Sequence, residues 1–136
     1  MASTSGYRER PHTADWELEV WAQDMPGLFE QAARGMYALA GARMQAGPRQ
    51  VRQQVLEALD GESLLVQFLE ELLYLQSMHG LAFDEFQLHF DGWKLQANLS
   101  GAPLDSLEKE IKAVTFHNLQ IEEGRRGLEV RIVFDV

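Results

Sequence analysis

The chain has 136 residues, with 12 Lys and Arg against 21 Asp and Glu, a net charge of −9, and no cysteine. This length suits a single domain with a real core. The acidic balance argues against unaided binding to RNA or DNA, because a basic patch supplies most of that affinity. It favours a cation or a basic protein as partner. Without cysteine, disulfides, thiolate zinc sites and cysteine nucleophiles are excluded.

The N-terminal segment lacks the apolar region of a signal peptide. The most apolar stretch, "SLLVQFLEELLYL" at 63–75, contains Glu70 and Glu71 and is too short to cross a bilayer. We therefore expect a cytoplasmic protein with no membrane association. Residues 1–11 are polar and predict a flexible tail. Residues 12–136 show no linker or repeat and predict one domain.

The first half of the chain alternates strand and helix patterns. Residues 15–22, "DWELEVWA", alternate polar and apolar positions and predict a half-buried strand. Helical spacing follows, with Asp24 as the N-cap and an end near Gly41. Residues 50–59 predict a strand. A second helix follows, capped by Asp60 and stopped by Gly80.

The second half is dominated by strands. Residues 83–99 predict a hairpin that turns at Asp91-Gly92. Residues 103–110 predict a short helix or turn, and 111–136 predict two strands around a glycine-containing turn at 124–127. This order predicts an α+β fold, in which two main helices pack on one face of a mostly antiparallel sheet in two layers.

Two aspartates stand on the polar faces of the first and last predicted strands. Asp15 begins its strand and Asp135 ends its own. An antiparallel pairing would bring both to one place on the same face, whereas a parallel pairing would separate them. Two close carboxylates repel unless a cation lies between them, and oxygen-only ligands favour calcium, magnesium or manganese. The carboxylate or main-chain oxygens of Val136 would add a ligand. The alternative is two solvated carboxylates.

Four segments carry a family resemblance: "HTAD" at 12–15, "LLVQFLEELLYL" at 64–75, "IKAVTFHNLQI" at 111–121 and "RIVFDV" at 131–136. Together they resemble the archease family. The resemblance implies a small α+β accessory protein, not itself an enzyme, that activates the GTP-dependent RNA ligase joining 3′-phosphate and 5′-hydroxyl ends in tRNA splicing and RNA repair. Such a protein promotes guanylylation of the ligase histidine and multiple turnover. It meets tRNA or broken RNA only through the ligase.

The resemblance also implies site residues. The family's metal site, usually described with calcium, maps onto Asp15, Asp135 and Val136, and the lysine of "IKAVT" makes Lys112 a further functional position. The chain departs from the family pattern at Trp16, where a smaller aliphatic residue is usual, and at Phe116, where a tyrosine is usual. Neither departure touches the expected ligands, but they leave the identity of the partner ligase open.

Several alternatives stay open from the residues alone. His12 fits either a main-chain bond at a strand start or a functional role, and His117 fits either a hydrogen-bonded position at the edge of the core or a functional one. Lys112 is an exposed strand lysine or a cation that reaches a phosphate. Rival functions are a stand-alone metal-dependent hydrolase and a general RNA or protein chaperone.

Overall fold

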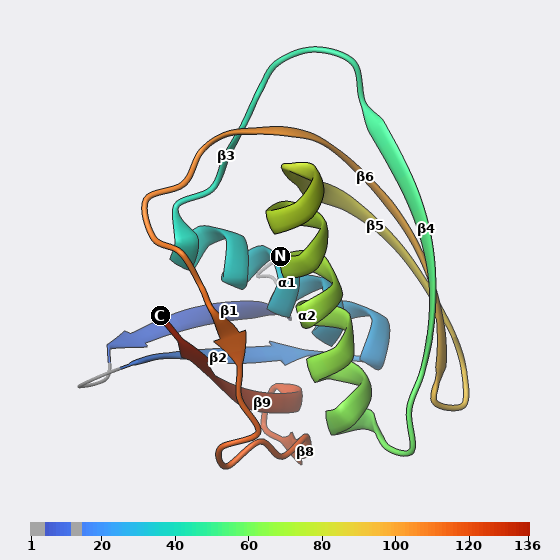
Figure 1. The fold of residues 1–136 in the computed structure, drawn as a ribbon. Coiled ribbons are helices and arrows are strands. Elements are labelled where there is room, and N and C mark those ends of the chain that lie inside the picture. Colours follow the sequence, from blue (N-terminus) through green and yellow to red (C-terminus); the bar gives the residue numbers. More distant parts are fainter. Residues whose placement is uncertain (1–4, 12–14) are drawn as a thin grey trace.

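The structure is a computed structural model that describes residues 5–11 and 15–136, the side chains of Pro11 and Asp15 excepted (Figure 1). Its elements in chain order are β1 (Gly6–Pro11), β2 (Asp15–Ala22), α1 (Met25–Ala40), β3 (Arg43–Met44), β4 (Gln50–Glu57), α2 (Gly61–His79), β5 (Leu81–Asp91), β6 (Lys94–Ser106), β7 (Ala113–Val114), β8 (Glu122–Gly124) and β9 (Gly127–Asp135).

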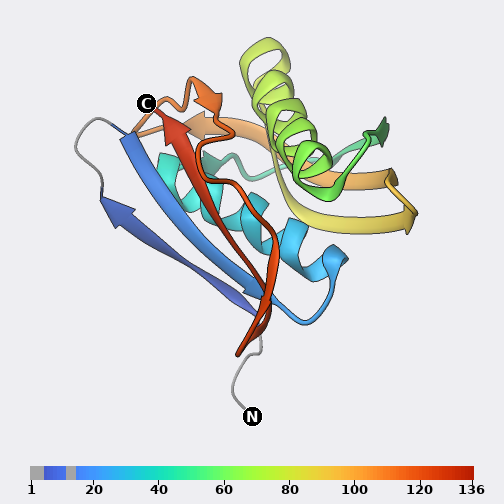
Figure 2. The same cartoon turned by 90° about the horizontal axis from the view of Figure 1, so that it is seen from below.

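The strands form two antiparallel sheets. The first sheet has the order β1-β2-β9-β7, with β8 also paired to β9. In the second sheet β6 pairs with β3, β4 and β5. Helix α1 packs mainly against β2 and also against β1 and β5, α2 packs against β4, β5 and β7, and the helices touch each other (Figure 2). The predicted α+β class, with two helices and antiparallel strands, is confirmed. The division into two sheets depends on long-range pairing that alternation along one strand does not specify.

Both helices begin and end where the sequence predicts. Oδ1 of Asp24 accepts a hydrogen bond from the Gly27 N–H at 2.8 Å, and Oδ1 of Asp60 accepts one from the Ser63 N–H at 2.7 Å. Each bond satisfies an amide that has no partner inside the first turn. At the other ends, Gly41 and Gly80 both adopt φ +63°, which a residue without Cβ reaches freely.

Three local predictions are wrong. Residues 6–11 form the edge strand β1 instead of a flexible tail; its polar composition fits an edge, where Arg8 lies opposite Glu19. Residues 103–106, predicted as helix or turn, continue strand β6. The hairpin loop is Gly92-Trp93, because Asp91 already pairs with Lys94, and Gly92 supplies the positive φ of +59°.

One core fills the space between the sheets and the helices. The first sheet contributes alternate residues of its two central strands, and α1 and α2 contribute their apolar stripes. The fully buried larger side chains are Leu18, Leu28, Phe29, Met36, Leu64, Leu65, Phe68, Leu69, Leu72, Phe83, Leu95 and Phe134. Since Phe134 is anchored in this core, the adjacent Asp135 is held at a fixed place on the opposite face.

Candidate metal-binding edge of the first sheet

Asp15 lies directly opposite Asp135 in the antiparallel ladder between β2 and β9. Of the two pairings that the sequence allowed, this is the one that brings the aspartates together. Residues paired in this way share a face, with Cβ atoms about 4.5–5.5 Å apart. On the other side of β9, Ala113 pairs with Asp135, and the Lys112 N–H donates to the Asp135 carbonyl at 2.7 Å. The backbone thus gathers Asp15, Asp135 and Lys112 where β2 begins and β9 ends. This end of the sheet is called the acidic edge below.

Elsewhere on this face, the acidic residues of β2 lie opposite cations. Glu17 pairs in register with Arg10, and Glu19 lies between Arg8 of β1 and Arg131 of β9. Such opposite pairs stabilise a ladder, whereas like charges directly opposite destabilise it. Within the β2–β9 ladder, Asp15 faces a second carboxylate. That pair is the place on the face where a cation would relieve repulsion.

Glu19 is the best-compensated acid of the face. Its Oε1 accepts from a guanidinium nitrogen of Arg126 at 2.5 Å, and its Oε2 accepts from Arg10 at 3.4 Å. These bonds, that of Arg126 first, hold the pKa of Glu19 below its ordinary value despite burial. Arg126 also bonds Glu129 at 2.6 Å and lies 3.9 Å from the Trp21 ring centroid. No local sequence pattern indicates this network, because Arg126 lies in a turn.

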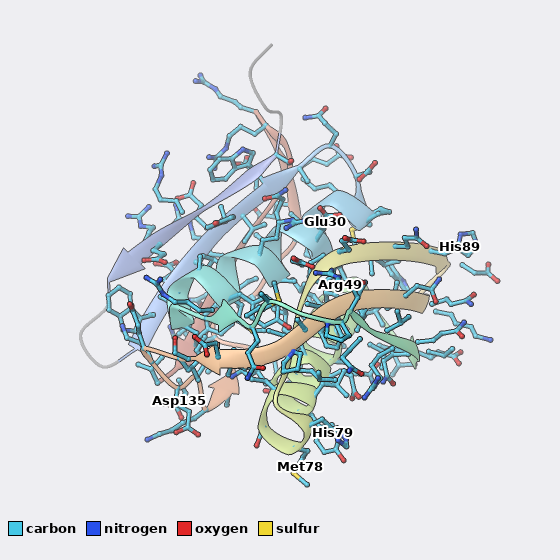
Figure 3. The ribbon with its side chains drawn as sticks, turned by 90° about the horizontal axis from the view of Figure 1, so that it is seen from above. Glu30, Arg49, Met78, His79, His89 and Asp135 are labelled. Carbon is cyan, nitrogen blue, oxygen red and sulfur yellow. The ribbon has the colours of Figure 1, made fainter. Side chains whose placement is uncertain are left out.

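The donor set of the edge suits a hard cation. Asp135 is exposed (Figure 3). Val136 is partly buried and packs against the core. Carboxylate and main-chain oxygens are the ligands that calcium and magnesium prefer. Among the side chains that the structure describes, no group of three or more His, Asp or Glu residues could hold a metal ion. The side chain of Asp15 is outside that set, so the pair is defined here by its register.

A second lysine lies near the same end of β2, on the opposite face of the sheet from the two aspartates. Lys109 Nζ is 3.5 Å from the centroid of the Trp16 ring, and Trp16 lies opposite Phe134 in the ladder. A cation over an indole face is attracted by the ring quadrupole. Trp16, where the family resemblance predicts a smaller aliphatic residue, therefore contacts Lys109 in this chain. Lys109 carries no recognisable sequence signal because it lies in an irregular segment.

The two histidine predictions have different outcomes. His12 lies outside the described residues. His117 is exposed, so its interpretation as a histidine at the edge of the core is wrong; β7 ends at Val114 and the chain turns before it reaches His117. Its Nε2 lies 3.2 Å from Nδ2 of Asn118, which adopts φ +51°. The preceding Phe116 is 60% exposed.

Over the part of the chain that the structure describes, the helices are all too short or too polar to span a membrane.

Two antiparallel sheets and two helices make this an α+β domain whose fold has already been seen in solved structures. Residues 7–136 match the model of the Archease protein family (MTH1598/TM1083). The chain belongs to the archease family.

Relatives agree with this assignment, and solved structures share the fold. A protein archease of Thermococcus gammatolerans is 33% identical over 82% of this chain and 84% of its own, and one of Methanosarcina barkeri is 30% identical over 96% and 95%. The solution structure of Methanobacterium thermoautotrophicum protein 1598 matches with a TM-score of 0.71 at 24% identity, over 96% and 99%. A Thermotoga maritima archease, described as a possible chaperone, matches at 0.69 and 22%, over 93% and 96%.

Proposed function

We propose that the protein is a non-catalytic activator of a GTP-dependent RNA ligase that joins 3′-phosphate and 5′-hydroxyl ends in tRNA splicing or RNA repair. It promotes guanylylation of the ligase histidine and multiple turnover. Membership of the archease family supports this role. The net charge of −9 supports it as well, because an acidic protein suits a basic nucleic-acid enzyme better than RNA itself.

One observation carries the proposal: the register that sets Asp15 against Asp135, beside Lys112. We infer that Asp15, Asp135 and the main-chain oxygens of Val136 hold a divalent cation, calcium first, with magnesium and manganese as alternatives. Calcium takes about six to eight oxygen ligands. Two carboxylates and a main-chain oxygen leave positions for water or for groups of the ligase.

A cation at this edge would supply neutralising charge near the phosphates that react during nucleotide transfer. The protein's own residues would hold the cation in position and contact the ligase. Asp135 is fixed in place by the ladder and by the buried Phe134 before it. Lys112, exposed next to it, is placed to contact a phosphate or a carboxylate of the ligase.

The test is a multiple-turnover ligation assay with the cognate ligase, GTP and RNA ends of the stated chemistry. The wild-type protein is compared with Asp135→Ala. We expect strong stimulation by the wild type and loss of most of it in the variant, because one of the two facing carboxylates is removed. Glu123→Ala is the matched control, since it removes the same charge from β8, at the far end of β9. It should stimulate like the wild type.

The same assay separates the rival functions. A metal-dependent hydrolase would cleave a phosphoester without the ligase, and an RNA chaperone would bind RNA in a salt-sensitive way. Stimulation that is equal for wild type and Asp135→Ala would remove the site from the mechanism while the activator role stands. Absence of stimulation by a folded wild-type protein would contradict the activator role itself.

A further inference from the structure

Strand β4 is an open edge of the second sheet. Among the residues that the structure describes, its eight residues pair with β6 alone. On its solvent face Val51 is 66% and Val55 is 58% exposed. An open edge presents free main-chain N–H and C=O groups, and exposed β-branched residues favour further pairing.

Two other edge strands, β1 and β5, are protected against such pairing. Edge strand β1 carries alternating charges from Arg8 to Arg10 and ends at a proline. Edge strand β5 has a bulge between Phe83 and Glu85, and a guanidinium nitrogen of Arg34 covers the carbonyl of Asp84 at 2.9 Å. Charges, prolines and bulges prevent an edge strand from pairing with a strand of another chain.

Strand β4 has little of this protection. Its ladder with β6 runs through eight pairs without a register shift, and it contains neither proline nor lysine. Arg52 donates to the carbonyl of Val51 at 2.9 Å. That bond comes from a flexible side chain, which an N–H of a paired strand can replace. The edge is therefore long and regular, and two of the four exposed residues on its solvent face, Val51 and Val55, are apolar.

The sequence of β4 is complementary to itself in one antiparallel register. A two-fold axis through Gln53 keeps every residue on its own face and sets Val51 of one copy opposite Val55 of the other. Arg52 then lies opposite Gln54, and like charges nowhere face each other within the strand. Glu57 lies opposite Arg49, whose guanidinium in its own chain bonds Ser100 of β6 and Asp84 of β5. A two-fold dimer requires such a self-complementary patch.

We propose that two copies of this chain associate through β4, antiparallel about Gln53, and join their second sheets into one continuous sheet. The interface consists of the main-chain ladder and two symmetry-related Val51–Val55 contacts. The acidic pair belongs to the other sheet, so the dimer leaves both Asp15–Asp135 edges accessible. The proposal is independent of the ligase.

The absence of cysteine from the chain gives a direct test of the register. Gln53 and Gln87 both lie opposite Asn98, on its two sides, and both are exposed. Gln53→Cys would place two thiols across the axis, about the separation that a disulfide bridges. Gln87→Cys is the matched control on the other edge. Under mild oxidation we expect a covalent dimer from Gln53→Cys, formed at least about tenfold faster than from Gln87→Cys.

A charge exchange tests the facing valines. Val51→Lys alone sets a lysine against Val55 of the other copy and should weaken the dimer, measured by light scattering after gel filtration or by sedimentation. The double variant V51K/V55E places opposite charges across the axis and should restore association. A wild type that stays monomeric over about a hundredfold concentration range, equal cross-linking of the two cysteine variants, or no recovery in the double variant would each overturn the proposal.

Discussion

Glu19 has a mostly buried carboxylate whose ionised form is stabilised in the folded protein. Its side chain is only 12% exposed, yet Arg126 and Arg10 both bond it. Burial alone would favour the neutral acid, but the two guanidinium groups outweigh it and lower the pKa below the ordinary value of 4.5. The folded state therefore binds this proton less readily than the unfolded chain, which makes stability depend on pH.

Glu19→Gln should change the acid limb of the stability curve. A depressed folded pKa contributes stability that is present above the unfolded value near 4.5 and is lost as the pH falls through the folded pKa. At neutral pH we expect the variant to lose about 1.5–3 kcal/mol, as for a hydrogen bond to a charged group. As the pH falls below 4.5 and through the folded pKa, its urea midpoint should approach that of the wild type. Parallel curves at every pH would contradict this account.

Lys112 is a second single residue with a testable role. It is exposed, and the proposed role is a contact with the ligase complex. If it contacts a phosphate or carboxylate of the ligase complex, Lys112→Ala should reduce stimulation of ligation about tenfold, the value of one charge-assisted hydrogen bond. Lys112→Arg should keep part of it. The melting temperature of both variants should match the wild type. Full stimulation by Lys112→Ala would leave Lys112 without a role in activation.

At the scale of elements, the second sheet depends on a close approach of two strands. Gly101 is buried in β6, beside the bulge of β5. A Cβ at this position would overlap the Ala82 carbonyl oxygen and lie 2.6 Å from the Phe83 Cα. These are backbone atoms, which cannot rotate away as a side chain can.

Gly101→Ala should accordingly be one of the more damaging single substitutions. We expect a loss of more than about 2 kcal/mol of unfolding free energy, because β5 must move away from β6. Gln96→Ala, on the exposed face of the same strand, serves as the control and should stay within about 0.5 kcal/mol. Equilibrium urea unfolding of both variants measures the difference. A fully stable Gly101→Ala would mean that the bulge accommodates a methyl group.

The difference between local and long-range information explains which features could be predicted from the sequence. The helix ends follow from Asp24, Gly41, Asp60 and Gly80, whose signals act within a few residues. Alternation placed Asp15 and Asp135 on the polar faces of their strands. Antiparallel pairing, one of the two alternatives, then sets them opposite each other. Strand β1 was missed because a polar strand on an edge has the composition of a tail. The two-sheet arrangement depends on which strands meet, which no local pattern encodes.

At the scale of the whole molecule, an ion at the acidic edge would stabilise the entire fold. A ligand that binds only the folded state adds about 2.7 kcal/mol at one hundred times its dissociation constant. We expect calcium to raise the melting temperature of the wild type by several degrees, which that energy implies for a chain of this size. In Asp135→Ala the shift should largely disappear, and in Glu123→Ala it should remain. Equal shifts in all three proteins would indicate binding elsewhere.

The central position of β9 has a consequence for the order of folding. It pairs with β2, β7 and β8, although it follows all of them in the chain, and Asp15 and Asp135 are 120 residues apart. The β1–β2 hairpin can form early, but the first sheet cannot close until that long loop has closed, and closure over such a distance is slow. The acidic pair is assembled in this step. An ion bound there would engage only chains in which β9 is docked, and it would slow the detachment of β9.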